Sequence, residues 1–191
     1  MNYISTKLYG PEEGLSIAYR QWRADRKSGK PADAHYTKDE IPGCSAIHGY
    51  AMSFYFEFEC TTLDARNWVV DFGAMRPLKD FLKENFDHTM LVALDDPHLE
   101  VYRNLYELGL CKLIEVERTG CEGLAHFLYE YVNEIFLPES YSDNSRDIHC
   151  RKVLVRETPS NSAYVEESVA DYRARLSAPT NRAEEIEKYG L

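Results

Sequence analysis

The clearest hydrophobic pattern lies between residues 46 and 63, where Phe54, Phe56 and Phe58 occupy alternate positions. A period of two places these rings on one face of an extended chain. The segment therefore predicts a strand with one buried face. Three other segments carry weaker strand signals: residues 14–22, 111–116 and 148–157.

Three segments repeat their apolar residues with the period of a helix: residues 75–85, 98–110 and 122–136. Residues 23–43 are polar and contain several Gly and Pro residues, so they predict a long loop. Residues 1–13 carry few signals, and residues 86–97 are interpreted as a connection. The tail after residue 165 is charge-rich and is expected to be helical.

The order of these elements is strand, strand, helix, helix, strand, helix, strand. This order predicts an α+β protein with a largely antiparallel sheet. We divide the chain into a domain of residues 1–165 and a charged helical C-terminal extension of residues 166–191.

The chain is acidic, with 32 Asp or Glu and 22 Lys or Arg among 191 residues and a net charge of −10. This charge disfavours nucleic acid or an anionic membrane as a partner. No apolar run reaches membrane-spanning length, and the N-terminus lacks the apolar core of a signal peptide. The five cysteines are widely spaced without a CxxC pair, which favours reduced thiols in a cytoplasmic protein.

Cys44 and His48 lie where the long polar loop enters the strongest predicted strand. A thiolate at such a place can act as a base or nucleophile if a cation or donor lowers its pKa. The simpler interpretation is a small buried thiol and a core histidine, and the spacing alone favours it.

Three acidic positions present a similar choice. Asp87 can orient the adjacent His88 and raise its basicity, although neighbouring side chains usually diverge. Glu157, at the end of a predicted strand, either accepts two N–H donors from a guanidine-like ring edge or is simply exposed. The negative charge of Glu122 can stabilise the N-terminus of its helix by interacting with the helix dipole. The sequence contains no GxGxxG, GxxxxGKS/T, GxSxG or HExxH motif.

Taken in order, these landmarks resemble the 6-pyruvoyl-tetrahydropterin synthase and 6-carboxy-tetrahydropterin synthase family. The resemblance covers about residues 14–165. The matching pieces are Cys44, His48-Gly49, Val69-Val70-Asp71-Phe72, Asp87-His88, Glu122-Gly123-Leu124-Ala125 and Glu157-Thr158. The resemblance implies a T-fold (tunnelling fold), which is an antiparallel four-stranded sheet with two helices on one face. It also implies subunits joined into barrels, as trimers stacked into a homohexamer with sites between subunits.

The resemblance assigns roles to the candidate residues. Glu157 matches the glutamate that binds a pterin or purine, and Glu122 is a second candidate for contacting the substrate. Cys44 matches a cysteine that accepts a proton, and Asp87 and His88 match an Asp-His pair that assists. The implied substrate is 7,8-dihydroneopterin triphosphate. One branch of the family converts it to the 6-carboxy product on the route to queuosine and other 7-deazapurines.

The family also binds zinc through three histidines, and here the chain departs from the pattern. Tyr19 and Tyr50 stand at two of the three ligand positions, and only His48 remains. A neutral tyrosine is a poor zinc ligand because the pKa of its phenol is about 10. We therefore expect little or no zinc and weak lyase activity, unless His35 folds in from the long loop as a replacement ligand.

Two functions remain open at this point. The first is a divergent lyase of this family that uses Cys44, Asp87 and His88. The second is a non-catalytic T-fold module that binds a pterin, purine or nucleotide without zinc chemistry. The three retained positions favour the enzyme, whereas Tyr19 and Tyr50 favour the binding module. The only protein partner indicated is a second copy of the chain.

Overall fold

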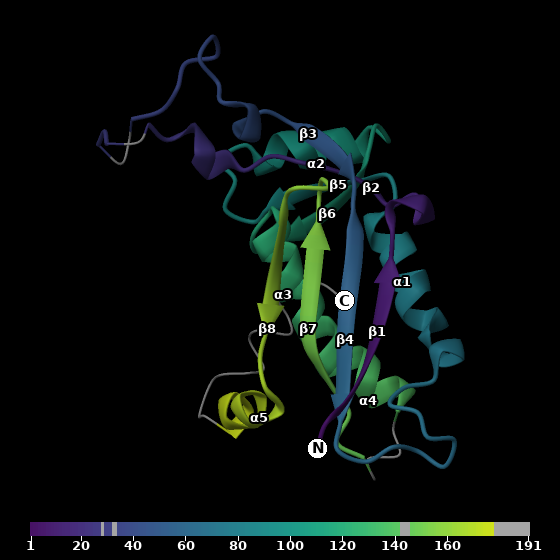
Figure 1. Cartoon of the computed structure of the whole chain (residues 1–191). Coiled ribbons are helices and arrows are strands. Elements are labelled where there is room, and N and C mark those ends of the chain that lie inside the picture. Colours follow the sequence, from purple (N-terminus) through teal and green to yellow (C-terminus); the bar gives the residue numbers. More distant parts are fainter. Residues whose placement is uncertain (28, 32–33, 142–145, 178–191) are drawn as a thin grey trace.

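The computed structural model describes residues 1–27, 29–31, 34–141 and 146–177, which form two four-stranded sheets packed with helices (Figure 1). The strands are β1 (Tyr3–Tyr9), β2 (Ser16–Tyr19), β3 (His48–Ala51), β4 (Ser53–Cys60), β5 (Thr89–Ala93), β6 (Lys112–Val116), β7 (His149–Arg156) and β8 (Ser162–Glu166). The helices are α1 (Arg76–Phe86), α2 (Leu99–Glu107), α3 (Cys121–Tyr131), α4 (Leu137–Ser140) and α5 (Val169–Ser177). Among the described residues, no helix has the length and apolarity needed to cross a membrane.

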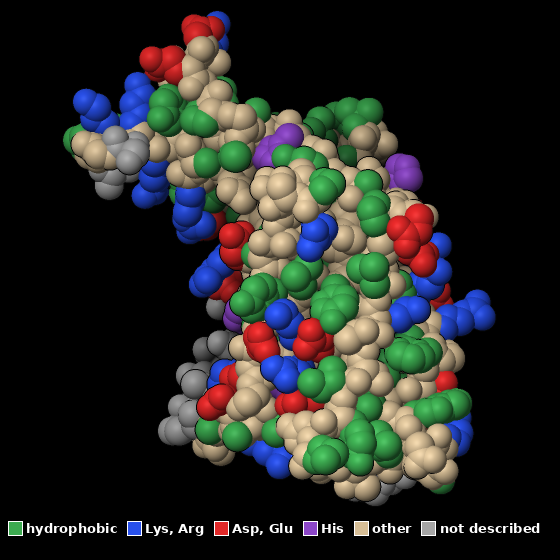
Figure 2. All heavy atoms as spheres, in the orientation of Figure 1, with side chains coloured by type: hydrophobic (Ala, Val, Ile, Leu, Met, Phe, Trp, Pro, Cys, Tyr) green, Lys and Arg blue, Asp and Glu red, His purple; other side chains and the backbone are tan. Residues whose placement is uncertain are grey.

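The first sheet has the strand order β1-β4-β7-β8, and every neighbouring pair is antiparallel. Helices α1 and α3 lie behind one face of this sheet (Figure 1). The antiparallel four-stranded sheet with two helices on one face, expected from the resemblance, is therefore confirmed. The opposite face carries apolar side chains beside Lys and Glu pairs (Figure 2).

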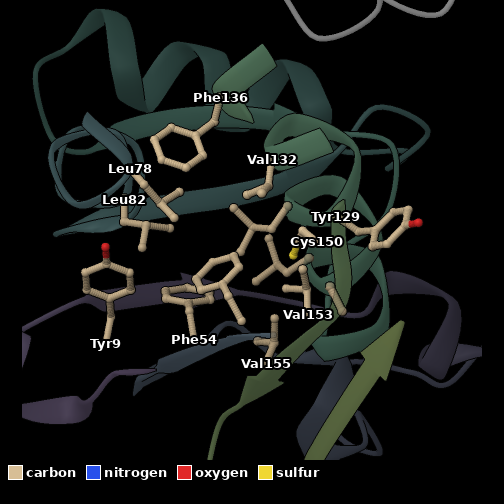
Figure 3. Close-up of a cluster of buried hydrophobic side chains, with 14 of the residues drawn as sticks. Tyr9, Phe54, Leu78, Leu82, Tyr129, Val132, Phe136, Cys150, Val153 and Val155 are labelled. Carbon is tan, nitrogen blue, oxygen red and sulfur yellow. The ribbon is translucent and has the colours of Figure 1, made fainter. Parts of the chain in front are cut away.

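The hydrophobic core lies between the first sheet and its helices. Phe54, Phe56 and Phe58 of β4 are fully buried, as their alternation predicts. Figure 3 shows Phe54 close to Leu78 and Leu82 of α1. Burying a phenylalanine side chain contributes about 1.5–3 kcal/mol, so these three rings stabilise the sheet together with the other buried side chains of the cluster.

The second sheet has the order β3-β2-β5-β6 and is mixed. Strand β2 pairs antiparallel with β3 and parallel with β5, and β5 pairs parallel with β6. This sheet corrects the interpretation of residues 86–97 as a connection, because β5 lies within them. Four of the five residues of β5 are buried, so the strand shows no alternation that a sequence pattern can detect.

The two sheets share one continuous stretch of chain. Strands β3 and β4 are separated only by Met52, whose N–H donates to the carbonyl of Leu15 at 3.0 Å. The strand predicted over residues 46–63 thus begins in the second sheet and ends in the first. The start of this stretch, at His48, carries part of the candidate site.

The loop between β2 and β3 extends away from the body, as the polar sequence predicts (Figure 1). Lys and Arg side chains gather along it in an otherwise acidic protein (Figure 2). At the C-terminus, α5 begins at Val169, later than the predicted start of the helical tail at residue 166. Residues 178–191 of that tail lie outside the described residues, and the division into residues 1–165 and 166–191 stays a prediction.

Candidate functional site

Three aromatic side chains meet on paired strands of the second sheet. Tyr19 of β2 lies opposite His48 of β3, and Ile17 lies opposite Tyr50. The rings of Tyr19 and His48 are 4.9 Å apart, and those of His48 and Tyr50 are 5.5 Å apart. Gly49 permits this close pairing because a Cβ atom there would lie 2.8 Å from the carbonyl oxygen of Ile17. The three positions matched to family zinc ligands are therefore brought together.

Glu157, which follows β7, joins this cluster from the first sheet. The buried Tyr19 hydroxyl donates to its Oε2 atom at 2.6 Å. Asn161 Nδ2 donates to its Oε1 atom at 3.3 Å. The turn between these residues is closed by the N–H of Glu157, which donates to the carbonyl of Asn161 at 3.2 Å. Glu157 therefore sits where the two sheets meet, with both carboxylate oxygens already hydrogen-bonded.

Cys121, the first residue of α3, approaches Glu157 from a third direction. Its thiol lies close enough to Glu157 for the charge of that carboxylate to act on it. Burial, followed by the negative charges of Glu157 and Glu122, raises the pKa of this thiol to about 12. The thiol is therefore protonated at neutral pH and adds no second negative charge beside Glu157. Gly120 permits the turn into α3, since its φ of 94° is unfavourable for any residue with a Cβ atom.

Burial also raises the pKa of the Tyr19 hydroxyl well above its usual range, and the bond to Glu157 adds to the effect. A phenol with a raised pKa keeps its proton across the physiological range. Tyr19 is therefore a permanent hydrogen-bond donor to Glu157.

The chain just after Tyr19 is braced by a buried ion pair. Arg20 makes two hydrogen bonds to Asp96, each of 2.8 Å, and the Asp96 side chain is 1% exposed. Thr119 donates to the carbonyl of Arg20 at 2.8 Å. These contacts connect the end of β2 to the segments that follow β5 and β6, so they restrict the movement of the backbone next to Tyr19.

Cys44 lies at this same end of β2 and is exposed. It belongs to a 3₁₀ turn, Gly43–Ser45, and its carbonyl accepts the N–H of Gln21 at 2.8 Å. Its thiol is thus open to solvent beside the aromatic cluster.

Asp87 and His88 lie toward the other end of β2. Nδ1 of His88 is 2.7 Å from Asp87 Oδ1, so the pair is formed, and the His88 side chain is 81% exposed. They precede β5, in which Thr89 pairs with Ile17. An extended chain rises about 3.3 Å per residue, so positions 17 and 21 are separated by about 13 Å. The structure therefore does not bring the Asp87–His88 pair to Cys44 within one chain.

Two other candidates lie away from the cluster. The Glu122 side chain is exposed and lines a small hollow of about 130 Å³ with Arg118 and His126. His35 lies in the β2–β3 loop, where its Nδ1 is 2.8 Å from Asp25 Oδ1. His35 is thus paired within the loop rather than with Tyr19.

Cys121 and Asn161 were not singled out from the sequence. No spacing rule connects either residue to Glu157, because their contacts depend on how α3 and the turn after β7 meet. The sequence did single out Glu122, which is adjacent to Cys121. The residue that lies beside Glu157 in the structure is Cys121.

The family-matched donor set does not fit a three-histidine zinc site. Nδ1 of His48 donates to the carbonyl of Ala46 at 2.8 Å, which leaves one imidazole nitrogen. The pKa values of Tyr19 and Tyr50 are both raised, mainly by burial, so neither phenol is ready to ionise. In the described part of the chain, no three His, Cys, Asp or Glu residues are grouped to hold a metal ion.

The antiparallel sheet, its two helices and the carboxylate at the end of β7 define a T-fold protein. An uncharacterized protein of Wolinella succinogenes, WS1659, shares the fold with a TM-score of 0.66 at 18% identity, over 88% of this chain and 99% of that one. A 6-pyruvoyl tetrahydropterin synthase of Plasmodium vivax matches with a TM-score of 0.55 at 12% identity, over 87% and 99%.

The sequence identifies the family within that class. The family model of 6-pyruvoyl tetrahydropterin synthase matches residues 28–168, so the chain belongs to this family. It is also 25% identical over 137 residues to a 6-carboxy-5,6,7,8-tetrahydropterin synthase of Aquifex aeolicus, covering 70% of this chain and 81% of the relative. The family resemblance seen in the sequence is thereby confirmed.

Proposed function

We propose that the protein binds a pterin or purine-like heterocycle at Glu157 and acts on it as a lyase of the 6-carboxy-tetrahydropterin synthase type. The proposed substrate is 7,8-dihydroneopterin triphosphate. The observation that carries the proposal is the Glu157 carboxylate, which hydrogen bonds hold at the junction of the two sheets. Membership of the family supports the choice of ligand.

A fixed carboxylate suits such a ligand for a simple reason. Each of its oxygens has two lone pairs. Tyr19 donates one hydrogen bond to Oε2, and Asn161 donates one to Oε1. The remaining lone pairs accept two adjacent N–H groups, as on the 2-amino amide edge of a pterin or guanine. A hydrogen bond to a charged group contributes about 1.5–3 kcal/mol, which makes Glu157 the main anchor.

Proton transfer is assigned to Cys44, Asp87 and His88. Cys44 is the proposed proton acceptor, and its exposed thiol lies beside the cluster. Asp87 orients His88 through Nδ1 and leaves Nε2 free to exchange a proton. Because Cys44 and His88 lie far apart in one chain, we propose that a second copy brings its Asp87–His88 pair to this Cys44.

The first sheet offers a way for copies to join. Strands β1 and β8 are its edges, and an unpaired edge is a template for another strand. Antiparallel pairing of β8 from one copy with β1 of the next continues the alternation of the sheet. We therefore propose a homo-oligomer, most simply a hexamer, in which the site is shared. Light scattering at low micromolar concentration should exclude a stable 22.1 kDa monomer.

Mixing two inactive variants tests the shared site. C44A and H88Q are each expected to lose turnover of dihydroneopterin triphosphate. After the two are unfolded and refolded together in equal amounts, about one quarter of the sites combine an intact Cys44 with an intact His88. Activity should recover to that level, whereas C44A refolded with C44S should stay inactive. No recovery in the first mixture would contradict a site shared between copies.

A non-catalytic binding module is the second candidate, and the aromatic cluster favours it. Tyr19 and Tyr50 supply no Lewis acid at the positions matched to family zinc ligands. This candidate gives binding of pterin at Glu157 but no product when dihydroneopterin triphosphate is added. Mass spectrometry of the reaction mixture separates the two functions. Under both, a cytoplasmic location remains a proposal from the cysteine pattern.

A further inference from the structure

We propose that Tyr19 is a positioning residue, which holds the Glu157 carboxylate so that the site selects heterocycles with two adjacent N–H donors. This inference rests on the proposed function and specifies its ligand class. Its starting point is the departure of this chain from the family's zinc-ligand pattern. Tyr19 occupies one of the ligand positions and donates a hydrogen bond to Glu157.

The geometry makes Tyr19 suited to this task. Its side chain is 0% exposed, and its ring lies against His48 at 4.9 Å, so the hydroxyl has little freedom to turn away. The hydroxyl donates to Glu157 Oε2 at 2.6 Å, within the range of charge-assisted O–H···O⁻ bonds. Since burial keeps the phenol protonated, this donor is present at every physiological pH.

Without this hydroxyl, the carboxylate would be far less constrained. The last torsion of a glutamate side chain joins an sp³ to an sp² carbon and is broad, so the carboxylate rotates easily. The side-chain amide of Asn161 donates to the other carboxylate oxygen, and this bond is longer, at 3.3 Å. Tyr19 is therefore the contact that fixes the plane in which the free lone pairs of Glu157 lie.

A fixed plane produces selectivity as well as affinity. A 2-amino amide edge places two donors against the two oxygens. A 2-oxo ring places a carbonyl oxygen against one carboxylate oxygen. Both atoms are acceptors and neither gains a hydrogen bond, so binding of the 2-oxo ring is weaker. A carboxylate that rotates can avoid part of this penalty. Loss of the Tyr19 hydroxyl should therefore reduce discrimination in addition to weakening binding.

Calorimetry with two matched probes, pterin and lumazine, tests this inference. Lumazine carries an oxo group where pterin carries its 2-amino group. The wild-type chain should prefer pterin, and Y19F should bind pterin about tenfold more weakly, the loss of one good hydrogen bond. Y19F should also show a smaller ratio of pterin to lumazine affinity.

Y55F is the matched control, because it removes a tyrosine hydroxyl that donates to a different carboxylate, Oε1 of Glu57 at 3.0 Å, and leaves the bond between Tyr19 and Glu157 intact. It should leave both affinities within about twofold of wild type. A purely structural role for Tyr19 would lower the melting temperature of Y19F and leave the affinity ratio unchanged. If Y19F does not fold, 4-fluorophenylalanine at position 19 keeps the size of the ring and removes the donor.

The outcomes separate the two claims. If wild type binds pterin and the variant without the hydroxyl keeps the same ratio, the positioning role is wrong and the proposed function stands. If wild type binds neither probe, the proposed function is wrong and the positioning role falls with it. A smaller ratio in Y19F with an unchanged ratio in Y55F supports the inference.

Discussion

The two ends of β2 present the candidate chemistry in opposite ways. At the Tyr19 end, side chains from β2 and from the turn after β7 donate hydrogen bonds to Glu157, and Cys121 at the start of α3 lies beside it. At the other end, Asp87 and His88 are hydrogen-bonded to each other, and His88 is open to solvent. The residues proposed to recognise a ligand are thus assembled within one chain. The residues proposed to move a proton lie apart in one chain, and we propose that they are assembled when copies of the chain meet.

The largest expected effect comes from two aspartates that flank β5. Asp96 is buried and bonds to Arg20, whereas Asp87 is partly exposed beside His88. D96A leaves the Arg20 guanidinium, whose side chain is 15% exposed, without its buried partner, so it should lower the free energy of unfolding by about 3 kcal/mol, the lower end of the range for a buried pair. D87A should lower it by no more than about 0.5 kcal/mol, because an exposed pair contributes little. Urea unfolding measures both, and equal losses would show that the two ends of β2 are equally braced.

Ligand affinity provides the next contrast between the two ends. E157Q should weaken the binding of pterin by at least about 1.5 kcal/mol, because the anchor loses its charge. D87N, an equivalent change at the other end, should alter affinity by less than about 0.5 kcal/mol. Calorimetry on both variants measures the difference. An affinity in E157Q equal to that of wild type would remove Glu157 from the anchor role.

The smallest expected effect concerns pH and the buried His149. His149 is 2% exposed, its Nε2 is 3.1 Å from the carbonyl oxygen of Glu167, and its Nδ1 has no hydrogen-bond partner among the described residues. Burial lowers its pKa, while the charges of Glu59 and Glu167 oppose that shift only in part.

The sign of the pH effect follows from this shift. Below the unfolded pKa of about 6.5, the unfolded chain binds a proton that the folded chain does not bind. Stability is therefore lost as pH falls through 6.5, with a slope of no more than about 1.4 kcal/mol per pH unit for one proton. H149F should flatten this part of the profile. A profile that H149F does not alter would mean that His149 is not the group responsible.

The sequence predicted some parts of the fold for a clear physical reason. The alternation of Phe54, Phe56 and Phe58 is local, and it predicted β4 correctly. Strands β1 and β8 were missed because they are edge strands, of which most residues are not fully buried. Their position depends on β4 and β7, and a local pattern carries no record of those partners.

The site shows the same limit. His48 and Glu157 were found as ordered landmarks, and Tyr19 and Tyr50 as departures from the zinc-ligand pattern. The structure brings all four together. The role of Cys121 was not predicted, because it lies 36 positions before Glu157 and depends on where α3 begins. The pairing of Arg20 with Asp96, 76 positions apart, was missed for the same reason.

The most direct test of the account is the affinity for pterin before and after metal removal. The central claim is that Glu157, held by Tyr19, binds the heterocycle without help from zinc. Protein treated with a chelator should bind pterin as tightly as the protein as purified, and elemental analysis should find well under one zinc per chain. Y19H/Y50H, which restores the family pattern, should gain zinc. One zinc per native chain, whose removal abolishes the binding of pterin, would contradict the claim.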